Sequence, residues 1–245
     1  MGTHEGHPYK QNSIMKHENI FILSVGGSLV VPKSGIDVKF LQDFKKLIVK
    51  HAKLGKRFVI VVGGGTTARN YQDAARRVGK LTRDDIDWLG IHATRLNGHL
   101  MRTVLRDIAN PIMVKDPTRP IGKWTEPVLV AAGWKPGWST DYVATRLAKK
   151  VGATTIANLS NIDYVYTKDP NKFRNAKKIE SISWKAFRKM VGDVWDPGMN
   201  VPFDPIASKL AEQCKMHVAI VNGTNIKNLD RLLSGKSFEG TQIED

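Results

Sequence analysis

Short apolar runs alternate with segments of helical periodicity along most of the chain. The run FVIVV at Phe58–Val62 is apolar at every position, which is typical of a central parallel strand that is buried on both faces. Strands that alternate with helices indicate an α/β fold with a parallel sheet covered by helices. The expected strands are Ile20–Val25, Phe58–Val62, Ile112–Val114, Val128–Ala131, Thr154–Asn158, His217–Val221 and Gly240–Ile243. The expected helices are Val38–Lys53, one opened by the triple glycine Gly63–Gly65, Arg83–Ile108, one after Ser139, Ser183–Val191, Pro205–Lys215 and Ile226–Leu233.

Two of these helices carry patterns that predict their buried face. The helix Arg83–Ile108 starts at a capping-box variant formed by Thr82 and Asp85. Its apolar stripe predicts a core face that in part could be an oligomer contact, and consists of Ile86, Leu89, Ala93, Leu96, Leu100, Val104 and Ile108. The inner side of the helix after the triple glycine is expected to hold Ala68, Tyr71, Ala74, Ala75 and Val78.

Three glycine-bearing turns each come directly after an expected strand. They are Gly26-Gly27-Ser28, Gly63-Gly64-Gly65 and Gly133–Asp141 (GWKPGWSTD). Glycine lets the backbone approach a ligand closely, and the free N–H groups of a following helix face an anion. None of the turns matches a P-loop or a GxGxxG fingerprint. Three such turns on one sheet edge predict a site for several phosphates, and therefore a phosphoryl-transfer enzyme.

Polar side chains beside these turns are the candidate catalytic residues. Arg69 lies on the first helical turn after the triple glycine, where its guanidinium could bind the same anion; a surface ion pair is the alternative. Asp141 lies at a helix start, where it could anchor Mg²⁺ or a catalytic lysine, or simply cap the helix. Further donors in the loop before it are Lys135, the Pro136-Gly137 turn, Ser139 and Thr140.

The back half of the chain offers candidates for binding a second nucleotide. Asn161, Tyr166 and Asp169 lie on a polar loop over residues 160–178, and suit a ribose and a base edge; a turn-rich surface loop is the alternative. Lys209 lies on the second turn of the helix opened by DPIASK. A cation near a helix start is poorly placed for the helix dipole, which hints that its ammonium binds a phosphate. A plain exposed lysine is the other interpretation.

Composition narrows the class of protein. The net charge of +15 attracts anions, and eight of the basic residues lie between Lys168 and Lys189. A solvated face explains that segment, as would nucleotide steering or incidental RNA contact. No apolar run approaches the roughly 20 residues that span a bilayer. The single cysteine, Cys214, excludes an internal disulfide and favours a cytoplasmic location. Residues 1–14 lack the apolar core of a secretory signal and are expected to be a flexible tail or a cloning remnant, with Met15 a candidate natural start.

Taken in order, segments between about Ile20 and Ile243 resemble the amino acid kinase superfamily and, within it, the archaeal-type UMP kinases. They are VGGSLV, VVGGGTTARNY, DWLGIHATRLN, PGWSTDYVA, SNIDYVYTKDP, AKKI, DPIASK and VNGTN. The resemblance implies a three-layer α/β/α sandwich with a mainly parallel central sheet, as a single domain over residues 15–245. It implies an acceptor-binding lobe over residues 15–150 and an ATP-binding lobe over residues 151–245. It also implies Mg·ATP as donor, UMP as acceptor, UDP as product in pyrimidine nucleotide synthesis, and a cytosolic homohexamer.

The resemblance assigns roles to individual residues. Residues that would hold the transferring phosphates or face the transfer zone on the ATP side are Gly26, Gly27, Ser28, Gly65 and Arg69. Residues that would contact UMP are Gly64, Asp87, Trp134, Lys135, Pro136, Gly137, Trp138, Ser139 and Thr140. The ATP site would be completed by Ser160, Asn161, Tyr166 and Asp169. Asp141 and Lys209 align with the organising aspartate and the phosphate-binding lysine of related kinases. Mg²⁺ would be held through the phosphates, with Asp141 the one candidate protein ligand.

The chain departs from the family pattern at three places. Ser24 stands where many members carry the lysine that stabilises the moving phosphoryl group, as in the archaeal-type UMP kinases, which also lack that lysine. Tyr164 replaces the glycine of the usual DGVY. Trp134 and Trp138 add indoles that could stack on a base or narrow the acceptor pocket. Two other hypotheses therefore stand beside the UMP kinase: the same fold with a carboxylate or small phosphate-ester acceptor, and a non-catalytic nucleotide- or oxyanion-binding protein. A nucleic-acid-binding role is disfavoured because no RNA-binding motif is recognisable.

Overall fold

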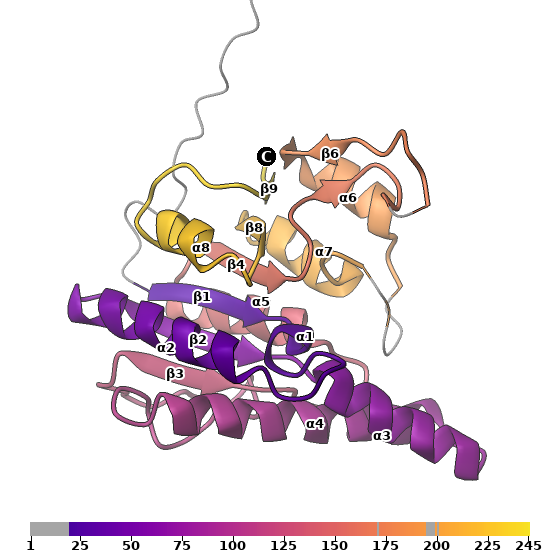
Figure 1. The fold of residues 1–245 in the computed structure, drawn as a ribbon, viewed down its shortest axis with the longest axis horizontal. Coiled ribbons are helices and arrows are strands. Elements are labelled where there is room, and N and C mark those ends of the chain that lie inside the picture. Colours follow the sequence, from indigo (N-terminus) through magenta and orange to yellow (C-terminus); the bar gives the residue numbers. More distant parts are fainter. Residues whose placement is uncertain (1–19, 171, 195–198, 200) are drawn as a thin grey trace, which may run out of the picture.

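A seven-stranded sheet forms the centre of the molecule (Figure 1). The computed structural model describes residues 20–170, 172–194, 199 and 201–245. The strand order in the sheet is β3-β2-β1-β4-β8-β9-β7. The five parallel strands are β1 (Ile20–Val25), β2 (Arg57–Val62), β3 (Val128–Ala131), β4 (Thr155–Ser160) and β8 (His217–Asn222). At the edge, β9 (Thr241–Ile243) runs antiparallel to β8 and parallel to β7 (Ser181–Ile182). A separate antiparallel ribbon pairs β5 (Val165–Tyr166) with β6 (Lys178–Ile179).

Helices cover both faces of this sheet, which confirms the predicted three-layer α/β/α sandwich. On one face, apolar side chains pack from α2 (Val38–Lys53), α4 (Arg83–Val104) and α8 (Ile226–Leu233). On the other face they pack from α5 (Thr140–Val151), α6 (Trp184–Val191) and α7 (Pro205–Gln213). The strands supply both cores by alternation, because Phe21 and Leu23 join the first cluster and Ile22 joins the second. No helix among the described residues is both long and apolar enough to cross a membrane.

Most expected elements are present with small shifts of their ends. The expected strand Ile112–Val114 is wrong. The chain there touches the edge strand β3 only through two isolated bridges, Ala109 with Val128 and Val114 with Ala131. Pro111 stands between these bridges and has no N–H to donate, so a continuous ladder does not form. The long helix ends at Val104, before the expected Ile108.

The helix after the triple glycine, α3 (Gly65–Val78), does not bury the face that its apolar residues predicted. Tyr71 is 61% exposed and Val78 is 90% exposed, and the only buried residue of this helix is Gln72. The far half of α3 projects away from the sheet (Figure 1). The helix therefore packs mainly on α4, where the Gln72 amide donates to the Ile86 carbonyl.

The apolar stripe predicted on α4 is also partly wrong. Ile86 and Ala93 are buried as expected, but Leu96 is 62% exposed. The buried face of α4 is rotated toward polar and small residues: Asp87, Thr94, Asn97 and Gly98 are buried together with Ile91 and Met101. The capping box is confirmed, because Thr82 accepts from the Asp85 N–H and the Asp85 carboxylate accepts from the Thr82 N–H.

The two halves of the chain share one sheet. Strand β1 of the front half pairs with β4 of the back half, with Ile22 opposite Ile156, and α5 ends next to the expected boundary at residue 150. On the helical layer, Asp230 of α8 accepts from Lys50 of α2 at 2.7 Å. The expected tail at residues 1–14 lies outside the described residues.

Two glycine turns contact each other backbone to backbone at the carboxyl ends of β1 and β2. A Cβ placed on Gly27 would overlap the Gly65 nitrogen and lie 2.6 Å from the Gly63 carbonyl carbon. Gly65 has φ +60°, and a Cβ there would lie 2.6 Å from the Gly27 carbonyl carbon. The Gly63 N–H donates to the Val25 carbonyl at 2.9 Å, which ties the turns together. No larger residue fits either position without moving a strand end.

We predict that Gly27→Ala destabilises the protein by about 3 kcal/mol or more, because the added methyl group meets backbone atoms that cannot change rotamer. Gly79→Ala is the matched control, since Gly79 has an extended backbone and open space around its Cβ direction, and should stay within about 0.5 kcal/mol of wild type. Urea unfolding at one pH measures both. Equal stability of the two variants would contradict the backbone contact.

Candidate active site

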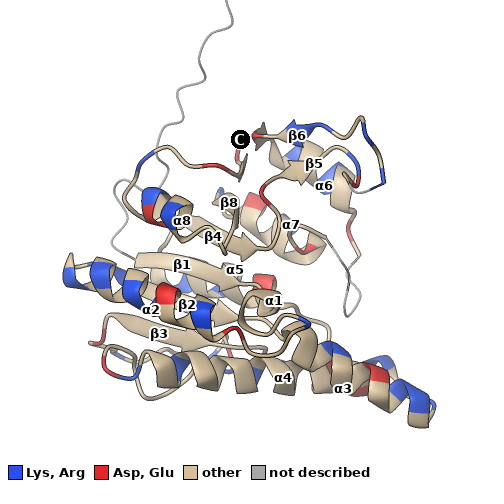
Figure 2. Ribbon diagram, viewed as in Figure 1, with Lys and Arg blue, Asp and Glu red and all other residues tan. Residues whose placement is uncertain are grey.

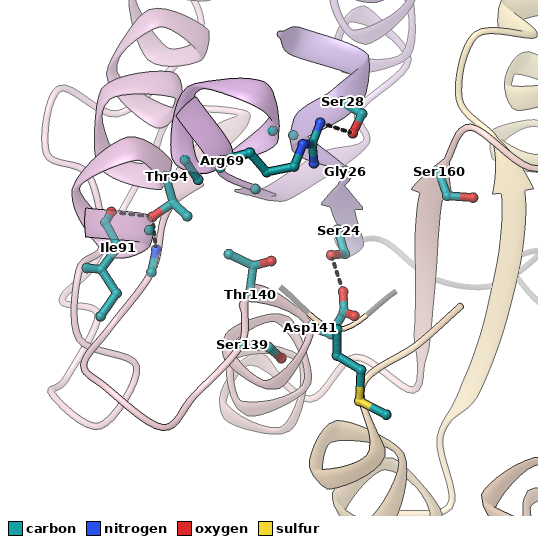
Figure 3. Close-up of a pocket in the computed structure, with 18 of the residues that line it drawn as sticks. Ser24, Gly26, Ser28, Arg69, Ile91, Thr94, Ser139, Thr140, Asp141 and Ser160 are labelled. Carbon is teal, nitrogen blue, oxygen red and sulfur yellow. Dashed lines mark hydrogen bonds between the residues drawn. The ribbon is translucent and has the colours of Figure 1, made fainter. Parts of the chain in front are cut away.

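The three glycine turns converge on one cleft of about 310 Å³ at the carboxyl ends of the parallel strands (Figure 3). This is the edge at which open α/β sheets bind their ligands. Twelve of the residues selected from the sequence line this cleft: Gly26, Gly27, Ser28, Gly64, Gly65, Arg69, Asp87, Trp138, Ser139, Thr140, Asp141 and Ser160. Residues from β1, β2, α3, α4, α5 and β4 therefore meet at one place.

The glycine wall of the cleft carries its cation. Arg69 lies on α3 and donates from Nη2 to the Thr66 hydroxyl at 2.9 Å and, more weakly, toward the Ser28 hydroxyl at 3.4 Å (Figure 3). These contacts hold the guanidinium across the start of α3, where the first N–H groups of the helix have no intrahelical partner. Among the described residues that line the cleft, Arg69 is the only Lys or Arg. Anion binding here therefore rests on one guanidinium and on backbone N–H groups.

The remaining positive charge lies elsewhere on the molecule. Figure 2 shows Lys and Arg on the loop between β5 and β6, on α6, and along the outer sides of α2 and α8. Part of this charge is paired, as between Lys178 and Glu180 at 2.6 Å. The high net charge of the chain is thus spread over the outer elements and is not concentrated in the cleft.

The floor of the cleft is acidic. Ser24, at the end of β1, donates from its hydroxyl to Asp141 Oδ1 at 2.8 Å, and the Asp204 N–H reaches Asp141 Oδ2 at 3.3 Å. Burial raises the pKa of Asp141 to about 6, and repulsion from the Asp204 carboxylate raises it further, while the bond from Ser24 opposes the shift. Asp204 is itself buried, and burial raises its pKa as well. Two carboxyl groups therefore share the place where many family members hold a lysine.

The wall opposite the glycines joins α4 to the loop that precedes α5. Asp87 Oδ2 accepts from the Gly137 N–H at 2.6 Å, and the Thr94 hydroxyl accepts from the Gly133 N–H at 2.7 Å. Burial raises the pKa of Asp87, and the bond from Gly137 opposes this. The two contacts fix both ends of the loop against one helix face. The start of α5 is then set by Ser139, whose hydroxyl accepts from the Tyr142 N–H.

The indoles of this loop are packed together. The Trp138 ring stacks on Tyr142 with centroids 4.1 Å apart, and the Trp134 ring lies 5.8 Å from that of Trp138. Trp138 lines the cleft, whereas Trp134 does not and carries the Lys135 ammonium over its ring at 4.4 Å. The Trp134 carbonyl accepts from Arg95 at 2.7 Å.

Other residues selected from the sequence lie away from the cleft. Those that do not line it are Trp134, Lys135, Pro136, Gly137, Asn161, Tyr166, Asp169 and Lys209. Gly137 still contributes indirectly, through its N–H bond to Asp87. Lys209 is exposed on α7, and the residue buried beside it is Ser208, whose hydroxyl donates to the Asp204 carbonyl. The rotation of α7 therefore points the serine inward and the lysine toward solvent.

Several polar residues at the cleft were not selected from the sequence. Gln72, Thr94 and Asn158 line it, and Asn97 is buried behind the triple glycine. A signal for some of them was present. Asp87, Thr94 and Asn97 recur at helical spacing in DWLGIHATRLN, and so form a polar stripe beside the apolar one.

A divalent cation would find few ligands in the protein itself. Among the described residues, no group of three or more His, Cys, Asp or Glu side chains is close enough to hold a metal ion. Asp141 is the carboxylate that lines the cleft next to the turn after β1, with Asp204 buried behind it. The donor set suits an ion carried mainly by phosphate oxygens.

Comparison with known proteins agrees with this geometry. Residues 19–222 match the amino acid kinase family. The chain is 35% identical over 223 residues to the uridylate kinase of Hyperthermus butylicus, which covers 89% of this chain and 95% of that protein. It is 34% identical over 226 residues to the uridylate kinase of Thermoplasma volcanium, covering 91% and 97%.

Solved structures give the same result. The crystal structure of uridylate kinase from Archaeoglobus fulgidus matches with a TM-score of 0.78 at 30% identity, over 92% of this chain and 100% of that chain. The family match and these similarities each extend over most of the chain. The protein therefore belongs to the amino acid kinase family.

Proposed function

We propose that the protein is an ATP-dependent UMP kinase that transfers the γ-phosphate of ATP to UMP and releases UDP and ADP. The observation that carries the proposal is the convergence of three glycine turns on one cleft, in a chain similar over most of its length to uridylate kinases. A site with three such turns suits two polyphosphate groups that meet end to end. Production of UDP would place the enzyme in pyrimidine nucleotide synthesis.

The reaction asks for alignment and charge neutralisation more than for acid–base chemistry. The acceptor phosphate of UMP is already an anionic nucleophile and requires no general base. Arg69 and the N–H groups of Gly27, Gly64 and Gly65 would bind the phosphate oxygens, where they stabilise charge that spreads in the transition state. Mg²⁺ bound with ATP would neutralise the remaining phosphate charge, with Asp141 as its candidate protein contact.

Acceptor and donor would occupy different sides of the cleft. The α4 side, with Gly64, Asp87, Trp138 and Thr140, would bind UMP, and these residues belong to the proposed acceptor lobe at 15–150. The β1 and β4 side, with Gly26, Ser28 and Ser160, would bind the phosphates of ATP. The lobe at 151–245 would hold the adenosine, with Asn161, Tyr166 and Asp169 farther from the cleft.

The acidic floor gives this site a distinct electrostatic requirement. Ser24 supplies a hydroxyl where many relatives supply an ammonium, and it is occupied by Asp141. An ionised Asp141 beside incoming phosphates raises the demand for a divalent cation. A neutral Asp141 removes that repulsion, and its pKa of about 6 lies close enough to neutral pH for phosphate binding to change its charge.

The proposal includes a cytoplasmic homohexamer. Its support is an exposed apolar surface on α3 and α4, where Tyr71 and Leu96 flank a groove that Leu89 and Ala93 also line. Exposed apolar patches of this kind mark association surfaces. The apolar residues that the sequence pattern assigned to the core would then be buried between subunits.

The proposal predicts that UMP is the preferred acceptor in an ADP-release assay with Mg·ATP, compared with CMP, acetylglutamate and isopentenyl phosphate. A nucleotide acceptor can use the Trp138 region and the loop tied to Asp87, whereas the other two have no base to place there. Turnover with acetylglutamate or isopentenyl phosphate alone would favour the alternative acceptor class. Tight ATP binding without turnover for any acceptor would favour a non-catalytic nucleotide-binding protein.

For catalysis, Arg69→Ala should lower kcat/KM by about 10²–10³-fold, because it removes the one side-chain cation that lines the cleft among the described residues. Arg77→Ala, on the exposed last turn of the same helix, is the control and should remain within about twofold of wild type. Lys209→Ala tests the two placements of that lysine. Its exposed position predicts a near-normal rate, and a loss as large as that of Arg69→Ala would show that it reaches the phosphates during turnover.

Asp141→Asn should lower turnover and change the pH dependence of stability. Burial raises the folded-state pKa of Asp141 from its ordinary value of 3.8 to about 6, so its ionised form is the destabilised one. The stability lost by ionisation is absent below pH 3.8 and complete above about pH 6. The melting temperature of the variant minus that of wild type should therefore rise by a few degrees between pH 4 and pH 8. A difference independent of pH would mean that Asp141 titrates normally.

A further inference from the structure

A buried amide on α4 grips the glycine turn from behind the cleft. The Asn97 side chain is 3% exposed, and its Nδ2 donates to the Gly63 carbonyl and to the Gly64 carbonyl, each at 2.9 Å. Both hydrogens of one amide group are thus used on two consecutive peptide units. A search for phosphate-binding residues along the sequence passes over Asn97, because it touches no side chain of the cleft.

The geometry of the peptide bond makes this grip consequential. In a trans peptide the carbonyl oxygen of one residue and the N–H of the next point in opposite directions. Holding the Gly63 and Gly64 oxygens against Asn97 therefore directs the N–H groups of Gly64 and Gly65 the other way. Gly64 and Gly65 line the cleft, so those N–H groups are available to an anion there.

Glycine peptides need such a restraint more than others. Without a Cβ, a glycine occupies positive and negative φ with similar ease, so a peptide in the triple glycine can flip at little cost. Gly65 has φ +60°, and Gly64 begins the helix at φ −78°. A flipped peptide would present a carbonyl oxygen to the phosphate in place of an N–H, and would repel it.

We propose that Asn97 is a positioning residue for phosphoryl transfer: it holds the Gly63–Gly65 turn in the conformation whose N–H groups bind phosphate. The proposal rests on the proposed function only in that the turn binds a phosphate group, whichever acceptor carries it. Asn97 touches no substrate in this account. Its effect on the reaction passes through the orientation of two peptide groups.

The test uses an isosteric change with a matched control. Asn97→Asp keeps the size of the side chain but puts oxygens against two carbonyls, and can donate one hydrogen bond only when it is protonated. Asn228→Asp is the control, because Asn228 is also buried, donates from Nδ2 to the Glu239 carbonyl and lies on α8, outside the residues that line the cleft. Asn97→Ser, which retains one hydroxyl donor, is the intermediate variant and serves if Asn97→Asp fails to fold.

Three measurements separate positioning from simple stability: the melting temperature, kcat and KM for UMP with Mg·ATP, and the Kd for Mg·ATP. We expect both Asn→Asp changes to lower the melting temperature, but only Asn97→Asp to lower kcat/KM, by about 10²-fold at pH 8. The loss in Asn97→Asp relative to wild type should shrink as the pH falls from 8 to 6, since a protonated carboxyl can donate again. Asn97→Ser should lie between Asn97→Asp and wild type.

Kinetic constants and Kd within about twofold of wild type for Asn97→Asp, or for Asn97→Ser if the first does not fold, would overturn the proposal and leave Asn97 a stabilising residue. An equal loss of activity in Asn228→Asp would overturn it as well. If wild type shows no turnover with UMP, the proposed function fails, and the Kd for Mg·ATP still decides the role of Asn97. A weakened Kd in the Asn97 variants alone would then support it.

Discussion

Backbone meets backbone where the turn after β1 crosses the turn after β2, and the site depends on that contact. Gly27 and Gly65 approach so closely that neither can carry a side chain, and the Gly63 N–H is bound to the Val25 carbonyl. The ends of two neighbouring strands are thereby brought into one surface. That surface presents peptide dipoles to a ligand without intervening side chains, which is the arrangement that phosphate oxygens can use.

Helix α4 holds the two acceptor-side turns in register with each other. Asn97 holds the turn after β2, while Thr94 and Asp87 hold the two ends of the loop before α5. All three side chains lie on one face of the helix, and the opposite side includes the exposed Leu96. A helix that looks like an ordinary core element is therefore a polar scaffold on its inner face. Any association through its outer face would act directly on the acceptor side of the cleft.

Charge is used sparingly in this cleft. Many relatives place a lysine at the end of β1, whereas this chain places Ser24 there, bound to Asp141. With Arg69 the only cation among the described lining residues, phosphate binding relies on peptide N–H groups and on the ion that accompanies ATP. A site built in this way is sensitive to backbone orientation, because small rotations of a peptide reverse the sign of what it offers to an anion.

The sequence by itself determined the class of fold, the strands and the location of the cleft, because these follow from local properties. Apolar periodicity shows which segments are buried strands, and glycine at a strand end marks a place without side chains. Gly26–Ser28, Gly63–Gly65 and Trp138–Asp141 were identified in this way, and they do meet.

Only the tertiary structure decided which polar side chains reach that cleft. The rotation of α7 turns Ser208 inward and exposes Lys209, and the projection of α3 leaves Tyr71 in solvent. Ser24 and Asp141 are 117 positions apart in the chain and share a hydrogen bond. Such contacts depend on how helices rotate and pack against the sheet, and a one-residue difference in rotation changes the inward side chain by about 100°. Local pattern does not contain that angle, so the sequence located the site and the packing selected its residues.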